Sequence, residues 1–236
     1  MTPSEVPAVI LCGGRGTRAW PLTQDVPKPL LAVGDRPVLH HLVEVFHAQG
    51  VRDLVLATGY RSELVQEWAD SVALPDGVTL TCVDTGEDTG TAERLRRARP
   101  AGAFFATYGD GLGDVDLRAL LERHRSAGRW ATVTSVPLPS QYGTLDLDDS
   151  DAVTGFQEKP RLRDHWINAG FFVFEQAALD EVTGEDLERD VLPQLAAKGE
   201  LVAHKHEGFW RSMDTQKDVA ELNALATGGG APWLLT

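Results

Sequence analysis

The sequence has few cysteines and no long apolar run. Its two cysteines, Cys12 and Cys82, are too few for a disulfide framework or a zinc site, so we expect buried free thiols. No stretch of about 18 apolar residues exists, and nothing is therefore predicted to span a membrane. The N-terminal segment lacks the basic residues and the apolar length of a secretory signal, which favours a cytoplasmic protein.

Positive charge is also scarce. The chain has 22 lysines and arginines against 35 aspartates and glutamates, a formal net charge of −13. Such a protein repels a phosphate backbone, which argues against DNA or RNA binding as its main function. If it binds nucleotides, it must concentrate its few cations where the phosphates lie and recruit metal ions as well. Lysines and arginines beside glycine turns are therefore the first candidates for a site.

The pattern of apolar residues predicts an α/β fold within a single domain of 236 residues. The predicted strands cover residues 8–12, 53–58, 78–83, 103–108, 130–136, 143–147, 152–156, 167–174 and 201–206. The predicted helices cover residues 37–49, 62–72, 93–99, 116–127, 186–198 and 215–225, with Pro193 expected to kink or interrupt the fifth. Alternating strands and helices indicate a Rossmann-like, mixed but mainly parallel sheet flanked by helices. Ligands of such sheets bind beyond the carboxyl ends of the strands.

One glycine-rich segment follows the first predicted strand, in the run LCGGRGTRAWPLTQDVPKPL. Gly13, Gly14 and Gly16 allow the backbone to approach a ligand and to point N–H groups at an anion. Arg18 and Lys28 add positive charge, and the prolines on either side of Lys28 hold it in an extended segment. The pattern is neither a P-loop nor a dinucleotide fingerprint. It predicts a cradle for a triphosphate; the alternative is a glycine turn with solvated cations.

Later motifs occur in a fixed order after this segment. They are Gly90-Thr91-Ala92, Tyr108-Gly109-Asp110-Gly111, Phe156-Gln157-Glu158-Lys159-Pro160 and Asn168-Ala169-Gly170. Together with GGRGTR and PKP, this ordered set resembles the signature of the sugar-phosphate nucleotidyltransferases. The runs VDTGEDTGTAERL and GFWRSMDT and the ending GGAPW look particularly like glucose-1-phosphate cytidylyltransferases.

The resemblance implies a nucleotidyltransferase or GT-A-like fold with a small β insertion over the sugar site. Residues 1–112 would mainly bind the nucleotide, residues 113–227 would mainly bind the sugar, and residues 228–236 would form a C-terminal tail. The implied reaction joins a nucleoside monophosphate from an NTP to a sugar 1-phosphate and releases pyrophosphate, with Mg²⁺ as cofactor. Homo-oligomers are common in the family, and the apolar tail Pro232-Trp233-Leu234-Leu235 is a candidate interface.

The resemblance also implies roles for individual residues. The nucleotide site would contain Leu11, Gly13, Gly14, Gly16, Thr17, Arg18, Lys28, Gly90, Thr91, Gly109 and Asp110. The sugar-phosphate site would contain Tyr142, Gly143, Glu158, Lys159, Asn168 and Gly170. Arg18, Lys28 and Asp110 would be catalytic, and Asp110 and Asp214 would bind the metal through oxygen. Asp214 has an alternative interpretation as a helix cap, and Lys159 as part of a surface turn.

The substrates stay open at this point. CTP and glucose 1-phosphate are favoured, but Pro21-Leu22-Thr23 and Val26-Pro27-Lys28-Pro29 look more like thymidylyl- or guanylyltransferases. Glu93-Arg94 also stands where many relatives have small residues, which leaves dTTP, GTP or another NTP, and another sugar or a cyclitol phosphate, as alternatives. Two other functions, a GT-A-type glycosyltransferase and a non-catalytic nucleotide-binding protein, are less favoured alternatives. The GGRGTR-to-PKP segment argues against the first, and the retained carboxylates and lysines argue against the second.

Overall fold

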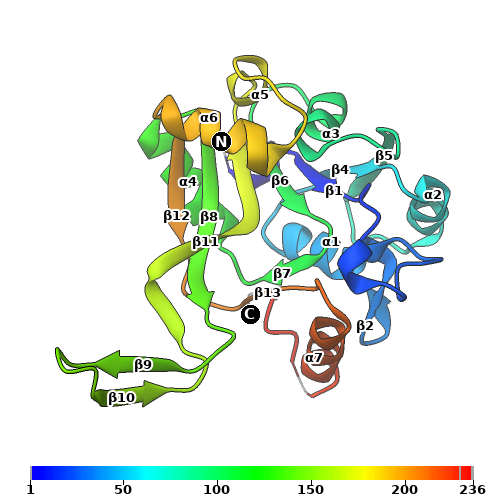
Figure 1. The fold of residues 1–236 in the computed structure, drawn as a ribbon. Coiled ribbons are helices and arrows are strands. Elements are labelled where there is room, and N and C mark those ends of the chain that lie inside the picture. Colours follow the sequence, from blue (N-terminus) through cyan, green and yellow to red (C-terminus); the bar gives the residue numbers. More distant parts are fainter. Residues whose placement is uncertain (1, 229, 235–236) are drawn as a thin grey trace.

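A seven-stranded sheet runs through the centre of the molecule, with strand order β12-β8-β11-β6-β1-β4-β5 (Figure 1). The computed structural model describes residues 2–228 and 230–234. Within these residues no helix is long and apolar enough to cross a membrane. The sheet joins strands from both halves of the chain, so the predicted halves share one sheet, and their division by substrate stays a prediction.

The strands of the first half form a parallel block. β1 (Ala8–Leu11) lies between β4 (Asp53–Thr58) and β6 (Phe104–Tyr108), and β5 (Thr79–Asp84) is the edge strand beside β4. All four residues of β1 are buried, as expected for a strand that is covered on both faces. The carboxyl ends of β1 and β6 therefore meet at the same edge of the sheet.

The strands of the second half make the sheet mixed. β11 (Arg161–Phe174) runs antiparallel to both β6 and β8 (Ala131–Pro139), and β12 (Leu201–Lys205) runs parallel to β8. The prediction of a mixed, mainly parallel sheet is confirmed. β11 begins at Arg161 rather than at residue 167, because its first part pairs with the end of β8 through irregular register.

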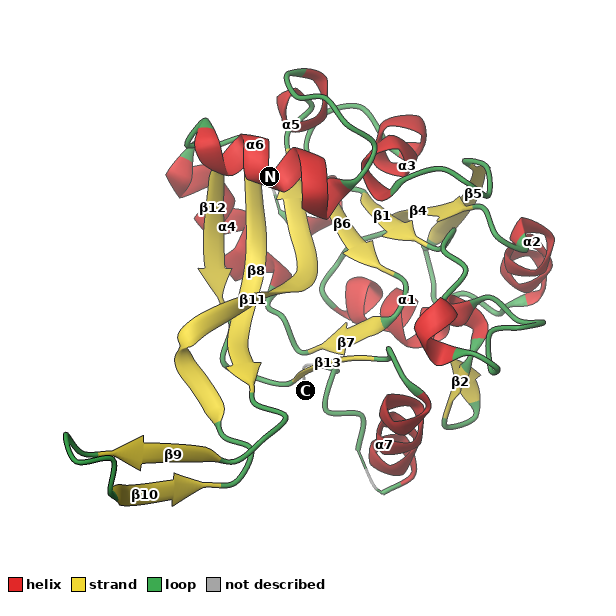
Figure 2. Ribbon diagram, in the orientation of Figure 1, coloured by secondary structure: helices red, strands yellow, loops and turns green. Residues whose placement is uncertain are grey.

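Helices cover both faces of the sheet (Figure 2). On one face lie α1 (Val38–Ala48), α2 (Ser62–Ser71), α4 (Leu117–Ala127) and α7 (Gln216–Thr227), and their apolar side chains share one buried cluster. On the other face lie α3 (Thr91–Ala98), α5 (Ala177–Asp180) and α6 (Leu192–Ala197), which contribute to a second buried cluster. The sheet thus separates two cores, one of them containing stacked and tilted phenylalanine rings, those of Phe104, Phe172 and Phe174.

The helix predicted over residues 186–198 consists of two parts. A π-helical turn, Leu187–Val191, precedes α6, and Pro193 stands in the first turn of α6. A first turn tolerates proline because its N–H groups have no partner inside the helix. The interruption expected from Pro193 is therefore present, and it falls just before the proline.

Several short elements gave no signal in the sequence. They are the 3₁₀ turns Pro3–Glu5, Thr17–Ala19 and Lys28–Leu30, the pair β2 (Ala32–Val33) and β3 (Arg36–Pro37), α5, and the strands β7 (Gly111–Gly113) and β13 (Trp210–Ser212). β7 and β13 pair antiparallel across almost a hundred residues of sequence. This small ribbon lies beside the main sheet and proves central to the site (Figure 1).

The β insertion is a hairpin of β9 (Thr144–Leu147) and β10 (Val153–Gln157). We expected it to lie over the sugar site, but in this structure it extends away from the body of the molecule (Figure 1). The hairpin buries no apolar face against the domain, since Leu145, Leu147, Val153 and Phe156 are all more than half exposed. Without such burial, nothing holds the hairpin down over the sheet.

The tail returns to its own domain. Trp233 is fully buried, and its ring contacts the rings of His41 and Phe209. The prediction that the tail is an interface is therefore wrong for Trp233, which is already covered within one chain. Leu235, the last residue of that predicted interface, lies outside the described residues.

Candidate active site

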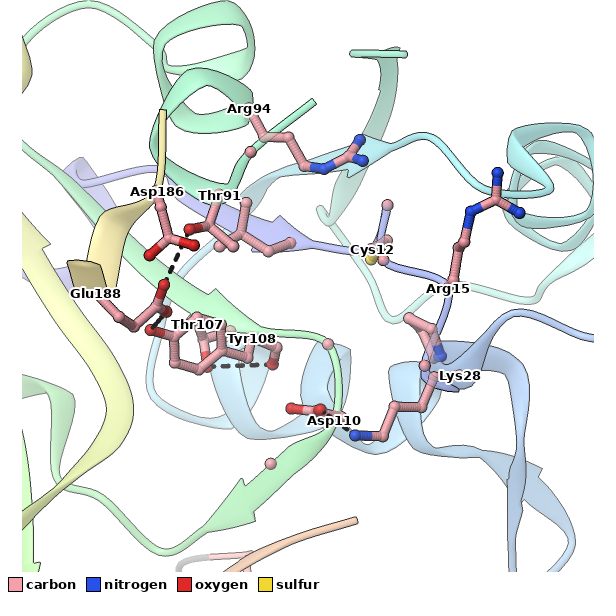
Figure 3. Close-up of a pocket in the computed structure, with 18 of the residues that line it drawn as sticks. Cys12, Arg15, Lys28, Thr91, Arg94, Thr107, Tyr108, Asp110, Asp186 and Glu188 are labelled. Atoms are coloured by element: carbon pink, nitrogen blue, oxygen red, sulfur yellow. Dashed lines mark hydrogen bonds and ion pairs between the residues drawn. The ribbon is translucent and has the colours of Figure 1, made fainter. Parts of the chain in front are cut away.

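A cavity of about 950 Å³ opens at the carboxyl ends of β1 and β6 (Figure 3). Its volume suits a small-molecule or cofactor site. Every residue predicted to bind the nucleotide lines it, and so do Asn168 and Asp214; from the nucleotide set these are Leu11, Gly13, Gly14, Gly16, Thr17, Arg18, Lys28, Gly90, Thr91, Gly109 and Asp110. The topology thus gathers one predicted set in one place, at the edge expected for a parallel sheet.

The glycine loop after β1 is supported by a buried arginine. Arg94 of α3 is 4% exposed and donates to the carbonyl oxygens of Thr58, Gly86 and Glu87 and to the Thr85 hydroxyl, at 2.6 to 2.9 Å. A Cβ on Gly13 would lie 2.1 Å from the Arg94 guanidinium, so only glycine fits there. The loop therefore lies directly on a positive charge, which suits an anion-binding loop.

Lys28 lies between the two predicted metal-binding carboxylates. Its Nζ is 2.5 Å from Asp110 Oδ2 and 2.8 Å from Asp214 Oδ1, and its side chain is 9% exposed (Figure 3). Arg18 makes a further ion pair with Asp214 at 3.0 Å, although its own side chain is 73% exposed. Two acids more than a hundred residues apart thus share one ammonium group. The negative charges of these two carboxylates are matched by the positive charges of Lys28 and Arg18.

The β7–β13 ribbon explains how these acids meet. Ser212 pairs with Gly111 in the ribbon, and the Met213 N–H donates to the Asp110 carbonyl oxygen at 2.8 Å. Asp110 and Asp214 therefore stand at the same end of one ribbon. Burial by itself raises the pKa of Asp214, but the hydrogen bond and charge of Lys28 and the charge of Arg18 bring this pKa below its usual range. Asp214 is consequently a carboxylate at neutral pH.

The two carboxylates are chemically suited to a hard divalent cation. Their oxygens already surround one cation point, the Lys28 ammonium. Among the described residues no group of three or more His, Cys, Asp or Glu side chains could hold a metal by itself. Mg²⁺ in proteins keeps several waters and substrate phosphate oxygens as ligands, so the protein needs to supply only one or two carboxylates. The donor set therefore fits magnesium bound together with a phosphorylated substrate.

The opposite wall of the cavity is built around Tyr108 and Glu188. The Tyr108 hydroxyl donates to Glu188 Oε1, the Thr91 hydroxyl donates to Glu188 Oε2 at 3.0 Å, and the Asn168 amide donates to the Tyr108 oxygen at 3.2 Å (Figure 3). Burial and then the Glu188 carboxylate raise the pKa of Tyr108, so its hydroxyl stays protonated. This network connects the predicted nucleotide residue Thr91 with the predicted sugar residue Asn168.

The predicted sugar-phosphate residues are not brought together. Tyr142, Gly143, Glu158 and Lys159 lie at the base of the extended hairpin and do not line the cavity, and the Tyr142 residue is 77% exposed. Among the described residues Lys159 forms one ion pair, with Glu158 at 3.5 Å. Their role in binding the sugar phosphate stays a prediction.

Gly170, one of the predicted sugar-phosphate residues, is constrained by its own backbone and by Tyr108. Its φ of +79° is unfavourable for other residues, and a Cβ there would lie 2.4 Å from the Tyr108 ring. The glycine accommodates Tyr108, while the Asn168 side-chain oxygen accepts the Gly170 N–H at 2.8 Å.

Sequence reasoning missed several cavity residues. Glu188 belongs to the π-helical turn and Asp186 caps it, and this segment reaches the site because the Ala92 N–H donates to the Glu185 carbonyl oxygen. No local sequence pattern predicts that main-chain hydrogen bond. Trp210, which was not among the predicted site residues, also lies in the cavity wall, and its Nε1–H donates to the Ala169 carbonyl oxygen at 2.6 Å. Its position in the GFWRSMDT run was the available signal.

Comparison with known proteins identifies the family to which the chain belongs. The model of the nucleotidyl transferase family matches residues 7–227. A probable glucose-1-phosphate cytidylyltransferase of Bacillus subtilis is 36% identical, over 96% of this chain and 98% of its own length. A probable mannose-1-phosphate guanylyltransferase of Oryza sativa is 35% identical, over 89% of this chain and 62% of its own length.

Among solved structures, HddC from Yersinia pseudotuberculosis, crystallised with GMP-PN, has a similar fold. Its TM-score is 0.71 at 22% sequence identity, with 92% of this chain and 98% of that chain covered. At this identity the likeness speaks for the fold alone. The overall fold of this chain is thus shared with that structure.

Proposed function

The chain belongs to the nucleotidyl transferase family as a sugar-phosphate nucleotidyltransferase, and we propose that it transfers CMP from CTP to glucose 1-phosphate in a magnesium-dependent reaction. The observation that carries this proposal is that Lys28, Asp110 and Asp214 meet in the cavity that the glycine loop also lines. Two polyanionic substrates must meet in this cavity. The convergence supplies both an ammonium group and a carboxylate pair suited to a divalent cation.

The proposed reaction is a direct displacement. An oxygen of the sugar 1-phosphate attacks the α-phosphorus of the NTP, a new P–O bond forms, the bond between the α-phosphorus and the bridging oxygen breaks, and pyrophosphate leaves. No protein nucleophile is needed, because positioning and charge neutralisation supply the rate enhancement in phosphoryl-type transfer.

The chain's own groups have distinct tasks in this proposal. The backbone N–H groups of the glycine loop bind phosphate oxygens, and Arg18 and Lys28 neutralise charge on the triphosphate and on the departing pyrophosphate. Asp110 and Asp214 would hold Mg²⁺, which when bound supplies Lewis-acid neutralisation of phosphate charge. Lys159 would bind the acceptor phosphate, and for that the hairpin base has to approach the cavity.

The base and the sugar are the finer part of the proposal. CTP and glucose 1-phosphate are favoured because the Bacillus subtilis relative matches over nearly the full length of both chains. The Oryza sativa relative, named for GDP-mannose chemistry, has almost the same identity over a shorter part of its length. Overall identity therefore supports the reaction class more firmly than the choice of base.

A substrate panel tests the proposal. CTP, UTP, dTTP, GTP and ATP are each combined with glucose 1-phosphate, mannose 1-phosphate and other sugar or cyclitol phosphates, and pyrophosphate release is measured with Mg²⁺ and with excess EDTA. We expect the CTP and glucose 1-phosphate pair to have the highest kcat/KM and EDTA to abolish release. A higher value for another pair would refute the substrate assignment, and full activity in EDTA would refute the metal requirement.

Two variants test the residues. Lys28→Ala and Asp110→Asn are each expected to lower kcat by about 10²- to 10³-fold, as when one preorganised charge-stabilising group is lost. The matched control is Lys198→Ala, since Lys198 lies over the Trp130 ring and lines no part of the cavity. Near-normal kcat/KM in both variants would refute these catalytic assignments.

A further inference from the structure

The segment 185–190, which contains most of the π-helical turn Leu187–Val191, places four acidic residues in the cavity lining, and three of them, Asp186, Glu188 and Asp190, differ in what their carboxylates bind. Asp186 accepts the Arg189 N–H at 2.7 Å, and Asp190 accepts the N–H groups of Glu185 and Asp186 at 3.0 Å. These two carboxylates are occupied by the backbone and hold the turn together. Among the described residues, the Glu188 carboxylate instead accepts from side-chain hydroxyl groups, those of Tyr108 and Thr91.

Glu188 still has free capacity to accept hydrogen bonds. Its side chain is among the exposed residues of the cavity wall, and in the part of the chain that the structure describes it forms no ion pair with lysine or arginine. A carboxylate offers about four lone-pair sites, and Tyr108 and Thr91 occupy one on each oxygen. An unpaired carboxylate facing a cavity repels phosphates but accepts hydroxyl groups strongly.

The position of Glu188 in the cavity indicates which substrate hydroxyl groups could donate to its carboxylate. Its two hydroxyl partners come from different elements on the same wall of the cavity: Thr91 from the start of α3, in the predicted nucleotide set, and Tyr108 from the end of β6, which leads to Asp110. Asn168 of the predicted sugar set contacts the same Tyr108 hydroxyl. Figure 3 shows Glu188 and Lys28 on different sides of the cavity, so the phosphate-binding cations and this hydroxyl acceptor are spatially separated.

We propose that Glu188 is a specificity-determining residue that accepts a hydrogen bond from a polyol hydroxyl of the bound substrates. The inference rests on the proposed function, since it requires a nucleotide and a sugar phosphate in this cavity. The hydroxyl belongs either to the ribose of the NTP or to the ring of the acceptor sugar. Both sources share the chemistry of a neutral O–H that donates to a carboxylate oxygen.

The test compares substrates with and without single hydroxyls. Wild type, Glu188→Gln and Glu188→Ala are assayed with the NTP against its 2′-deoxy and 3′-deoxy forms, and with the hexose 1-phosphate against its monodeoxy forms. A hydrogen bond to a charged group corresponds to about a 10- to 100-fold change in kcat/KM. We expect that penalty in wild type for one hydroxyl, and we expect it to fall below about threefold in Glu188→Ala, with Glu188→Gln between.

Glu87→Gln is the matched control. Glu87 is another cavity-lining glutamate, but Arg15 pairs with it at 2.7 Å, so its substitution should leave every deoxy penalty at the wild-type value. A purely structural role of Glu188 would lower kcat/KM for all substrates equally and leave the ratios unchanged. If a variant turns over too slowly, calorimetric Kd values for the NTP and deoxy-NTP, and for the sugar phosphates, give the same ratios.

The outcomes separate the two proposals. Loss of the penalty for a ribose hydroxyl assigns Glu188 to the NTP, and loss for a hexose hydroxyl assigns it to the acceptor; either supports the inference. Unchanged ratios in folded Glu188→Ala overturn it while leaving the proposed reaction intact. Absence of pyrophosphate release by the wild-type protein with every pair would instead overturn the proposed function, and the binding ratios would then decide the role of Glu188 alone.

Discussion

Replacing Lys28 by methionine is expected to destabilise the fold as well as to stop turnover. The change leaves Asp110 and Asp214 facing one another where the ammonium stood 2.5 and 2.8 Å away. Removing one partner of a buried ion pair costs about 3–5 kcal/mol. The carboxylates here are still about a quarter exposed, at 25% and 24%, so we expect the lower end, about 3 kcal/mol.

The assay is calorimetric melting at neutral pH without metal. For a domain of this size 1 kcal/mol shifts Tm by about 2–4 °C, so Lys28→Met should melt about 6–12 °C below wild type. Lys28→Met with Asp110→Asn should recover part of the loss, because the second change removes one of the two facing charges. Lys217→Met, on an exposed lysine, is the control and should shift Tm little. A Tm of Lys28→Met within about 2 °C of wild type, or a double variant less stable than the single one, would refute the reasoning.

Two further predictions concern the glycine loop and a buried histidine. Gly13→Ala should lower the free energy of unfolding by about 1–3 kcal/mol and weaken NTP binding, because its Cβ would lie 2.1 Å from Arg94. Gly14→Ala, with open space around it, is the control and should change Tm by little. Equal effects of both variants on Tm would contradict this account of the loop. Burial lowers the pKa of His124, so the unfolded chain takes up a proton near pH 6.5 before the folded protein does, and stability should fall as pH drops from about 7 to 5. His124→Gln should flatten that dependence in urea titrations, and an equal slope in both proteins would show that His124 does not contribute.

Local signals in the sequence were sufficient for the main architecture. The apolar run Ala8–Leu11 that ends in glycines gave the strand, the turn and the edge of the sheet at which the cavity opens. Each of the longer helices was recognised from its apolar face or its cap. The cap of α7 differs from the alternative interpretation given to Asp214: Thr215 is the N-cap, its hydroxyl accepts the Asp218 N–H, and the Asp218 carboxylate accepts the Thr215 N–H.

Contacts between distant segments could not be read in the same way. Asp110 and Asp214 were paired only through a family resemblance, since the three-residue strands that join them are too short for any periodic pattern. Glu188 was invisible because it reaches the cavity through a main-chain contact of α3 with Glu185. The hairpin at Tyr142 and Lys159 was recognised as strands, but the direction in which a hairpin extends depends on what covers its faces, and its own residues do not encode that.

The small ribbon of β7 and β13 has a consequence for the growing chain. All seven strands of the main sheet precede Phe209, so a chain released at that residue contains every element needed to form the sheet. It lacks β13 and Asp214, and with them one half of the acid pair. Domains generally fold as units during synthesis, N-terminal parts first. A chain that ends at Phe209 also lacks α7 and the buried Trp233, which belong to one of the two cores, so the segment after Phe209 completes that core as well as the acid pair.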